Sequence, residues 1–490
     1  MPRSGRTGGS KRALMDRYNL VVVGGGSGGL VVAAGGAGLG ARVALFEKGR
    51  MGGDCLNTGC VPSKALLRAA KAVRYAREAT RFGIAGAADL PPQDLSRVAA
   101  WVRGRREKIA PHDSVERFRS LGVDVIEGAG RLVAPHELEG GGRRIRGRHI
   151  VIATGSRPKV PVLPGLAEAG FLTNESVFDL ERLPPSLLVM GGGPIGCELG
   201  QAFARFGAAV TIVSSTEHLC PKEDADVAAV LERGLAAEGI TVLSRARASR
   251  VAIRDGRKVV TIERKGDDPI EVVADEILVA VGRTPNMEGL GLAEAGVTFT
   301  EKGIAIDDFC RTNLPNVWAI GDVAGGPLFT HWAGHQARVV LRNALFPGKA
   351  RCDRANLPWT TFTDPEIARV GLSETEANSS GLPHQVFIVP FEAVDRAVCD
   401  GEEDDFFAKV IADPKGRILG ASIVHPHAGD LLAELVLARK AGVTLGTLSA
   451  TIHTYPSLSE ISRALGDAYQ RTRLTPVTRR RLERVFAWLR

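Results

Sequence analysis

The sequence of 490 residues is poor in aromatic residues and contains no long apolar run. Phe, Trp and Tyr make up 5% of it, and the formal net charge is only +8. Nucleic-acid-binding surfaces combine a dense basic stripe with aromatic side chains that stack on bases. This composition therefore argues against a nucleic-acid partner. No stretch approaches the ~18 consecutive apolar residues that a membrane-spanning helix needs, and the composition as a whole is typical of a soluble globular protein of two to four domains.

Cysteine is also scarce, with seven residues. An odd and modest number does not resemble the disulfide framework of a secreted domain. The polar residues 1–17 lack the apolar segment of a secretory signal, so we predict a disordered tail there and, by default, a cytoplasmic protein. Five scattered cysteines are interpreted as buried or incidental thiols: Cys197, Cys220, Cys310, Cys352 and Cys399.

Glycine, by contrast, is abundant at 58 residues, and two glycine clusters occupy matching contexts. Each follows a short apolar run predicted to be a strand (18–23 and 186–190), and each opens a stretch predicted to be a helix. Such glycines let the backbone approach a pyrophosphate at the helix N-terminus. The G-x-G-x-x-G positions are Gly24, Gly26 and Gly29 in the first cluster and Gly191, Gly193 and Gly196 in the second. The sequence therefore predicts two dinucleotide sites.

The residue after the next predicted strand differs between the two units. It is Glu47 in the first unit and Ser214 in the second, each 23 positions after the first glycine of its motif. An acid at this position binds ribose hydroxyls, whereas NADP sites lose it and often gain a cation. Ser214, with Ser215 and the downstream Lys222, therefore favours NADPH at the second site. Glu217 keeps NADH as the alternative.

Later segments add a further candidate residue for cofactor binding and two regions with different residue patterns. A predicted strand ends at Asp322, whose carboxylate suits a ribityl hydroxyl, although a Gly-Asp pair is equally consistent with a turn cap. From 357 onward, strand-like runs (386–389, 408–411 and 421–424) precede helices, which predicts a separate α+β domain. Residues 477–490 predict a basic amphipathic helix that is either simply solvated or able to contact an anionic membrane or a partner.

The most informative segment runs from Gly52 to Lys64 and contains Cys55 and Cys60. Pro62 suits the first turn of a helix, which puts Cys60 near a helix N-terminus with Lys64 one turn on. Both features lower a thiol pKa, and the four-residue spacer allows the two thiols to close into a disulfide. A zinc site would need two more nearby ligands, which the sequence lacks, and a structural disulfide is uncommon in a reducing cytoplasm. We therefore predict a redox-active pair.

The segment GGDCLNTGCVPSK (52–64) resembles the active-site signature of the pyridine nucleotide–disulfide oxidoreductases, the relatives of dihydrolipoamide dehydrogenase, glutathione reductase and mercuric reductase. The resemblance extends from Asn19 to about Pro476 and includes the motifs at 153–155, 281–286, 319–322 and 362–366. It implies FAD in the first site, NAD(P)H in the second and a homodimer. The implied fold is α/β, with two Rossmann-like domains plus a C-terminal α+β dimerisation domain. The expected boundaries are 18–157 and 281–355 for FAD, 158–280 for NAD(P), 356–476 for dimerisation and 477–490 for the tail.

The resemblance also implies roles for single residues. Cys60 is expected to face the flavin, Cys55 to meet the substrate, and Lys64 to pair with Glu198 near the flavin. The residues expected to bind FAD are Gly24, Gly26, Gly29, Glu47, Lys48, Gly53, Lys64, Gly130, Ala153, Thr154, Gly155, Arg283, Asp322 and His331. Those expected to bind NAD(P) are Gly191, Gly193, Gly196, Glu198, Ser214, Ser215, Lys222 and Gly282. No resident metal is expected.

The C-terminal part of the signature departs from the family. There a His-Pro pair and a later Glu, supplied across the dimer, act as acid and base for the thiol. Aligned on the proline and Glu460, the His position holds Tyr455, and His453 lies two residues earlier. An ordinary Tyr has a pKa near ~10 and His near ~6.5, so the phenol is a poor proton shuttle. Interface packing is an equally open role for both residues.

This departure bears on the electron acceptor. Reduction of a disulfide needs a proton for the leaving thiol, whereas a soft metal ion such as Hg(II) binds to a thiolate pair directly. We therefore expect a mercuric reductase-like acceptor, even though the terminal cysteine pair of those enzymes is missing and Cys399 is the last cysteine. The alternatives are a small disulfide or quinone, dihydrolipoamide, or a redox-sensing role.

Overall fold

The computed structural model describes residues 15–85 and 90–490, so the predicted tail over 1–14 lies outside the described residues. The chain divides into two compact units. Unit 1 contains the chain up to Asn57 together with Glu107–Arg157 and Thr284–Cys352. Unit 2 contains Thr58–Arg106, Pro158–Arg283 and Asp353–Arg490.

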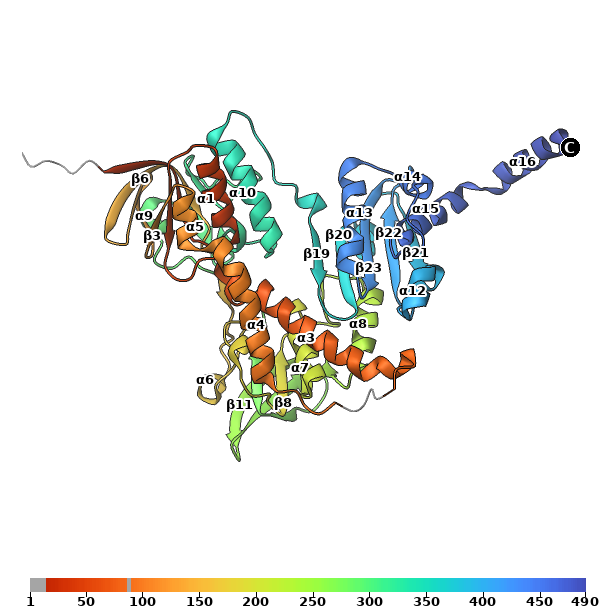
Figure 1. The fold of residues 1–490 in the computed structure, drawn as a ribbon, viewed down its shortest axis with the longest axis horizontal. Helices are drawn as coiled ribbons and strands as arrows, with labels where there is room; N and C mark the ends of the chain where they lie inside the picture. Colours follow the sequence, from red (N-terminus) through yellow and green to blue (C-terminus); the bar gives the residue numbers. More distant parts are fainter. Residues whose placement is uncertain (1–14, 86–89) are drawn as a thin grey trace, which may run out of the picture. The chain divides into compact units, whose positions relative to one another are not determined.

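Unit 1 is built on a seven-stranded sheet in which β3, β2, β1, β6 and β18 run parallel. Parallel strands are covered on both faces and are therefore continuously apolar, as Leu20, Val21 and Val22 of β1 show at 0% exposure. Helices α1 and α10 lie side by side in this unit (Figure 1). The sheet consists of β1 (Asp16–Val23), β2 (Val43–Glu47), β3 (Val123–Glu127), β4 (Arg131–Ala134), β5 (Glu137–Gly140), β6 (Arg143–Ile152) and β18 (Val317–Ala319).

The start of β1 corrects the predicted tail boundary at residue 17. Asp16 and Arg17 already belong to the strand, paired in register with β6. Asp16 also forms ion pairs with Arg42 (3.2 Å) and Arg143 (3.1 Å), interactions between distant segments that a local reading of polar residues does not reveal.

The remaining elements of unit 1 are short or lie beside the sheet. They are α1 (Ser27–Gly38), α2 (Gly53–Asn57), η2 (Ala110–Asp113), α5 (Val115–Ser120), α9 (Leu292–Ala295), β16 (Phe299–Thr300), β17 (Gly303–Ile304), η4 (Gly321–Ala324) and α10 (Thr330–Leu345). The strands β7 (Ser156–Pro158) and β15 (Arg283–Pro285) lie where the chain passes from one unit to the other.

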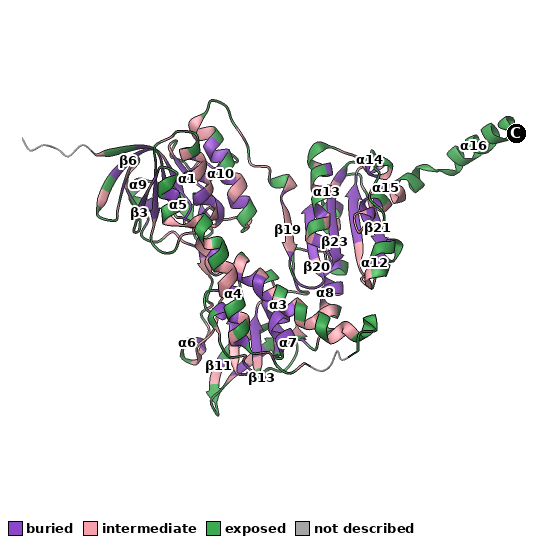
Figure 2. Ribbon diagram, in the orientation of Figure 1, coloured by how far each residue is buried: buried purple, intermediate pink, exposed green. Residues whose placement is uncertain are grey.

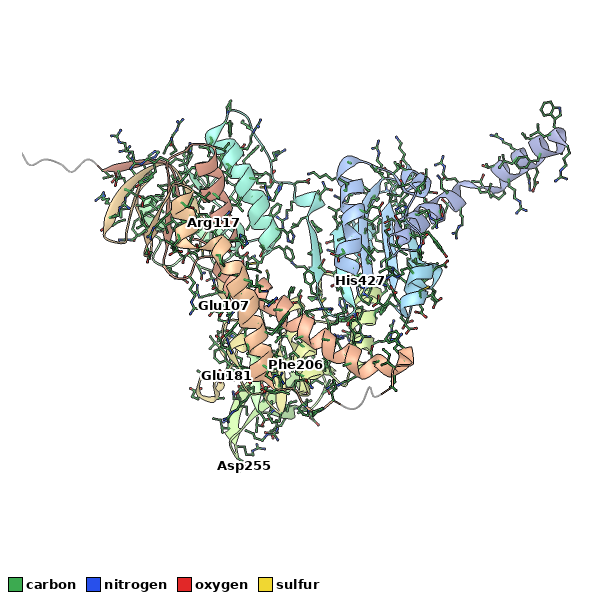
Figure 3. All side chains as sticks on the ribbon, in the orientation of Figure 1. Glu107, Arg117, Glu181, Phe206, Asp255 and His427 are labelled. Atoms are coloured by element: carbon green, nitrogen blue, oxygen red, sulfur yellow. The ribbon has the colours of Figure 1, made fainter. Side chains whose placement is uncertain are left out.

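The first part of unit 2 holds a four-stranded parallel sheet in the order β10, β9, β8, β14. Helix α7 covers it, and Phe206 at the end of that helix is fully buried (labelled in Figure 3). The elements are η1 (Ala79–Phe82), α6 (Leu166–Ala169), η3 (Val177–Asp179), β8 (Ser186–Met190), α7 (Pro194–Phe206), β9 (Ala209–Val213), α8 (Ala225–Ala237), β10 (Thr241–Leu243), β11 (Ala246–Arg254), β12 (Arg257–Arg264), β13 (Ile270–Ala274) and β14 (Glu276–Val279).

Helices α3 (Cys60–Glu78) and α4 (Leu95–Ile109) differ from the expected grouping, because residues 58–106 belong to unit 2 and not with the segments expected to bind FAD. The apolar face of α3 explains this. Ala65, Leu66 and Ala70 share one buried core with Phe203 and Phe206 of α7.

The C-terminal part of unit 2 is an antiparallel sheet in the order β19, β20, β23, β22, β21 with helices packed on it. The strands expected over 386–389, 408–411 and 421–424 are confirmed as β21, β22 and β23. The elements are η5 (Arg354–Asn356), β19 (Pro358–Thr361), β20 (Glu366–Gly371), α11 (Glu374–Ser380), β21 (Gln385–Pro390), η6 (Phe391–Ala393), α12 (Asp395–Asp400), β22 (Phe407–Ala412), β23 (Ile418–His425), α13 (Ala428–Ala441), α14 (Leu445–Ala450) and α15 (Glu460–Arg473).

Buried ion pairs join the two parts of unit 2. Asp364, just before β20, pairs with Arg74 of α3 (2.7 Å) and Arg205 of α7 (3.1 Å). Lys409 of β22 is 0% exposed and binds Asp226 (2.8 Å) and Asp224 (3.2 Å) at the start of α8. A buried charge is tolerated only when it is paired, so these contacts fix the C-terminal sheet to the preceding part of the unit.

The last helix, α16 (Pro476–Leu489), confirms the predicted helical tail, and every residue in it is exposed (Figure 2). Among the described residues, no helix combines the length and apolar composition needed to cross a membrane. Within the same ranges, no group of three or more His, Cys, Asp or Glu side chains is arranged to hold a metal ion.

Candidate active site

The first glycine turn joins β1 to α1 and leaves no space for side chains at two of its glycines. Gly24 has a φ of 109°, and a Cβ there would lie 2.4 Å from the carbonyl oxygen of Ala153. A Cβ on Gly29 would lie 1.9 Å from the carbonyl oxygen of Gly24. Gly26 stands at the N-cap of α1 and has no side chain with which to cap the first-turn amides. These N–H groups can therefore bind an anion such as a pyrophosphate.

Glu47 lies at the end of β2, beside this turn. Its carboxylate accepts hydrogen bonds from the N–H groups of Gly25 (2.6 Å) and Gly49 (2.6 Å). These bonds fix the carboxylate next to the glycine turn, and each oxygen keeps a second lone pair for a ribose hydroxyl. Lys48 is exposed.

The other strand ends of unit 1 are also fixed by hydrogen bonds. Thr154 donates its hydroxyl to the Asn286 carbonyl (2.7 Å), and the Asn286 amide donates to the Thr154 carbonyl (3.0 Å), which pins the turn of Ala153–Gly155. Asp322, in η4, accepts the hydroxyl of Ser156 at 2.5 Å. The expected FAD residues of three separate strand ends are thus held in defined positions by partners from distant parts of the chain.

The remaining residues expected to bind FAD divide between the units. Gly53, with a φ of 58°, packs against Gly26, where an added Cβ would lie 2.7 Å from the Gly26 Cα. Gly130 packs on Phe46, and His331 stacks on Phe329 with ring centroids 5.3 Å apart. Lys64 and Arg283 belong to unit 2.

The second glycine turn repeats the geometry of the first within unit 2. Gly191 has a φ of 123°, and its added Cβ would lie 2.3 Å from the Ala280 carbonyl oxygen. A Cβ on Gly196 would lie 2.0 Å from the Gly191 carbonyl oxygen. At Gly193, the N-cap of α7, an added Cβ would meet no atom of the described residues within 4 Å. The protein backbone therefore leaves no space for a side chain at Gly191 or Gly196, whereas the side of the turn at Gly193, where a ligand would lie, is open.

The strand end beside this second turn is lined differently from the expectation. Ser214 is only 2% exposed, and its hydroxyl lies 2.8 Å from that of Thr216. Ser215 and Lys222 are exposed. Glu217 forms an ion pair with Arg245, a residue that sequence reasoning missed. The backbone N–H of Arg245 donates to the Thr216 carbonyl (2.8 Å), so a cation does lie at this loop, supplied by the turn after β10.

The candidate redox cysteines lie on two helices, α2 and α3. Cys60 is the first residue of α3, as the position of Pro62 predicts, and it is exposed. Cys55 is half-buried within α2. The Asn57 amide donates to the carbonyls of Met51 (3.1 Å) and Gly53 (2.8 Å), which fixes the short helix α2. The boundary between the units falls between Asn57 and Thr58, so the two thiols belong to different units.

The ion pair expected on α3 is present within unit 2. Lys64 Nζ lies 2.6 Å from Glu198 Oε2 on α7 and 4.4 Å from the ring centroid of Phe362. Glu198 Oε1 accepts the backbone N–H of Phe362 at 2.9 Å, and the Glu198 side chain is 8% exposed. The carboxylate thus joins α7, α3 and the chain leading to β20.

The C-terminal candidates each have a polar partner. Tyr455 is 67% exposed and donates its hydroxyl to Asp395 at 2.9 Å. This hydrogen bond stabilises the neutral phenol and raises the pKa of Tyr455 above its ordinary value. The two ring nitrogens of His453 lie 3.1 Å from the Thr451 carbonyl and 3.0 Å from Glu434 Oε1.

Glu460 pairs with Arg463 at 2.8 Å, one turn later in α15. Sequence reasoning missed both Asp395 and Glu434, because each comes from a distant helix and carries no local motif.

Comparison with known proteins matches both parts of this arrangement. The family model described as pyridine nucleotide-disulphide oxidoreductase covers residues 18–337, and the model of the dimerisation domain of that family covers residues 357–465. The chain belongs to this family. Like other pyridine nucleotide–disulfide oxidoreductases, it is an FAD-dependent enzyme that uses NAD(P)H, and its C-terminal domain is the one through which the family forms homodimers.

Individual relatives of this oxidoreductase carry different names. It is 38% identical to a dihydrolipoyl dehydrogenase of Thermus scotoductus over 91% of this chain and 96% of that one. It is 34% identical to a mercuric reductase of Bacillus cereus over 90% of this chain and 70% of that one. A solved structure of the HOCl-induced flavoprotein disulfide reductase RclA from Escherichia coli is similar with a TM-score of 0.81 at 29% identity, over 92% of this chain and 99% of that one.

Proposed function

We propose that this oxidoreductase uses the thiol pair Cys55 and Cys60 to reduce a soft metal ion of the Hg(II) type, with NADPH as the electron donor. FAD, when bound, supplies two-electron transfer between the nicotinamide and the thiol pair. The two glycine turns fit the two dinucleotides. Each leaves no space for side chains at two of its glycines, and each leaves the N-terminus of the following helix, α1 or α7, without a side-chain cap. The observation that carries the choice of acceptor is the environment of Tyr455.

A thiol-disulfide acceptor needs a proton at the leaving sulfur, and the residues available to supply it are poorly suited. The pKa of Tyr455 is raised by Asp395, so its phenol does not give up its proton readily near neutral pH. His453 already has a polar partner at each ring nitrogen. Both observations favour an acceptor that requires no acid–base residue.

A soft metal ion is such an acceptor. Thiolates are the ligands that soft ions prefer, and Cys60 at the N-terminus of α3 lies where the helix dipole stabilises a thiolate. The metal ion would enter as the substrate, bound by the two thiolates, and would leave after gaining two electrons. A reducing cytoplasm, which we also propose as the compartment, would keep the pair in its dithiol form.

The test is anaerobic NADPH oxidation by the holoenzyme after Hg(II) is added with an excess of a small thiol. We expect turnover that Cys55→Ala abolishes and that Cys399→Ser, which removes an exposed thiol of α12, leaves unchanged. Reduction of the bound flavin by NADPH without turnover on Hg(II) would overturn the proposed acceptor. That result would direct the search to disulfides, quinones or a sensing role.

The identity to dihydrolipoyl dehydrogenases makes dihydrolipoamide the second candidate. A further variant distinguishes the two acceptors, since Tyr455→His restores the residue that the family pattern has at this position. We expect negligible dihydrolipoamide oxidation by the unaltered enzyme and a gain on the order of 100-fold in Tyr455→His, the typical contribution of general acid–base catalysis. Substantial dihydrolipoamide oxidation by the unaltered enzyme would favour dihydrolipoamide as the substrate.

NADPH is proposed over NADH because the strand end at Ser214 carries no acid and Arg245 lies at the adjacent loop. A guanidinium binds a 2′-phosphate bidentately. Arg245→Ala should therefore raise KM for NADPH on the order of 10-fold and leave KM for NADH unchanged, whereas Lys265→Ala, at a cation outside this loop, should change neither. An equal rise for both nucleotides would contradict the proposal.

A further inference from the structure

A second pair of thiols lies in unit 1, outside the site described above. Cys310 Sγ and Cys352 Sγ are 3.2 Å apart although the residues are 42 positions apart in the sequence. Cys310 is 0% exposed, and Cys352 is half-buried at the edge of the same apolar core. Neither residue belongs to the motifs that carry the family resemblance, and the sequence alone predicts only buried or incidental thiols at both positions.

The backbone holds both thiols in place. The N–H of Cys310 donates to the Asp307 carbonyl (2.9 Å), and the N–H of Cys352 donates to the Asp308 carbonyl (2.8 Å). The Asp307 carboxylate in turn accepts the N–H groups of Phe309 and Arg311, each at 2.9 Å. Both cysteines are therefore anchored to one short loop, and their proximity follows from backbone hydrogen bonds, which a change of side-chain rotamer alone does not break.

The two thiols differ in exposure and in pKa. The hydrogen bond from Cys310 lowers the pKa of Cys352, against the opposing effects of burial and of Asp307 and Asp308. The same bond, together with burial, raises the pKa of Cys310. The thiolate is the reactive form of cysteine, and Cys352, which is half-buried, is the thiol of the pair that an oxidant in solution can reach, whereas Cys310 is 0% exposed.

We propose that Cys310 and Cys352 form a second redox pair, which a hydroperoxide oxidises to a disulfide. The Cys352 thiolate attacks a peroxide oxygen, so that an S–O bond forms, the O–O bond breaks and the leaving oxygen departs as water after protonation. The Cys310 sulfur then attacks the resulting sulfenic acid, which forms the S–S bond, breaks the S–O bond and releases a second water. Two thiols and one hydrogen peroxide thus give one disulfide and two waters.

The step requires little movement. A disulfide has an S–S distance of about 2.05 Å, so the sulfurs must approach by roughly 1 Å from their separation of 3.2 Å. The bond would close a loop that contains η4 and α10, the elements that carry Asp322 and His331. Cys352 is also the last residue of unit 1 in the chain, so the cross-link would fix the point at which the chain leaves this unit.

The experiment is a titration of the dithiothreitol-reduced, desalted holoenzyme with hydrogen peroxide, followed by alkylation, trypsin digestion without reduction and mass spectrometry. We expect peptide 303–311 joined to peptide 352–354, two hydrogens lighter than their sum, and the loss of this species on adding dithiothreitol. The oxidised protein should melt on the order of 5 °C higher than the reduced protein, since the cross-link restricts the unfolded chain.

Variants separate the two roles without depending on catalysis. In Cys310→Ser, Cys352 should accumulate as a sulfenic acid that dimedone traps, whereas Cys352→Ser should give neither the cross-link nor a trapped species at Cys310. Exposed Cys399 reports general thiol oxidation in the same digest. Recovery of Cys310 and Cys352 as alkylated thiols while Cys399 is oxidised would overturn the proposal, as would sulfinic acid at Cys352 as the main product in the unaltered protein.

Discussion

At the scale of single residues, His425 shows how burial determines a protonation state. Its side chain is 0% exposed, its ring lies 4.0 Å from that of Phe391, and its Nδ1 accepts the backbone N–H of His427 (labelled in Figure 3) at 3.2 Å. Burial, reinforced by nearby His427, lowers the pKa of His425 to about 3. The imidazole is therefore neutral across the physiological range, and protonation would break the hydrogen bond at Nδ1.

This pKa predicts a pH-dependent stability. An unfolded His has a pKa near ~6.5, so below that pH the unfolded chain binds a proton that the folded chain does not. The contribution of His425 to the free energy of unfolding should then be highest above ~6.5 and decrease by about 1.4 kcal/mol per pH unit as the pH falls toward 3. In His425→Gln this contribution should be absent, which urea unfolding at pH 5.0, 6.0 and 7.5 measures.

Exposed His112 provides the control for this experiment. The variant His112→Gln should keep the pH dependence of the unaltered protein. If His425→Gln also keeps it, the acid sensitivity originates elsewhere.

The ion pair between Lys64 and Glu198 should contribute to stability as well as to the site. Removing one partner of a fully buried pair costs about 3–5 kcal/mol, and the exposure of the Lys64 side chain (37%) reduces this. We expect Lys64→Ala to lower the free energy of unfolding by about 1–2 kcal/mol, because the 8% exposed carboxylate loses its partner. Arg254→Ala, which breaks an exposed pair with Glu271, should cost much less, and equal effects would contradict this ranking.

The sequence predicts residues whose partners lie within a motif and misses partners brought together by the fold. Lys64, Cys55, Cys60 and the glycines follow from local spacing. Arg245, Asp395 and Glu434 do not, because a charged side chain on a loop or helix surface has the same local pattern whether it is solvated or paired.

At the scale of elements, two glycines of the turn between β8 and α7 have different roles, one in packing and one in nucleotide binding. Gly196→Ala would place a Cβ 2.0 Å from a backbone oxygen and should lower stability. Gly193→Ala has space on the protein side and a φ of −83° that any residue adopts, so it should fold normally and lose NAD(P)H affinity on the order of 10-fold or more, because the methyl group points to the place where the pyrophosphate approaches the backbone.

Thermal melting and nucleotide titration of the two variants distinguish these effects. A loss of stability in Gly193→Ala comparable to that in Gly196→Ala would show that the turn is not open on the ligand side.

The existence of the main strands and helices follows from apolar patterning, since parallel strands bury both faces and helices bury one. That α3 belongs to unit 2 does not follow from this patterning. Its apolar face shows that the helix is buried on one side, yet Ala65 and Leu66 are compatible with many partners, and only the completed core shows that α7 provides it.

At the scale of the whole molecule, α16 contributes nothing to the core, since all its residues are exposed. A chain that ends at Thr475 should therefore melt within about 1 °C of the full chain, as surface changes away from packed features do. A larger decrease would show that the helix packs against another copy of the chain. Co-sedimentation of both forms with phosphatidylserine vesicles distinguishes the alternatives for this helix: contact with an anionic membrane predicts that only the full chain is retained, and a solvated helix predicts that neither form is.

The buried ion pairs within unit 2 have a consequence for how such a chain can diverge. Asp364 and Lys409 lie in the C-terminal segment, whereas Arg74, Arg205, Asp224 and Asp226 lie before it. A recombination event that exchanged the C-terminal segment alone would leave uncompensated charges on both sides of the breakpoint, among them the buried Asp364, Lys409 and Arg205. Chimaeras with relatives should therefore remain functional when the exchanged block carries both halves of this network, so that the two segments are inherited together although they are separate in the sequence.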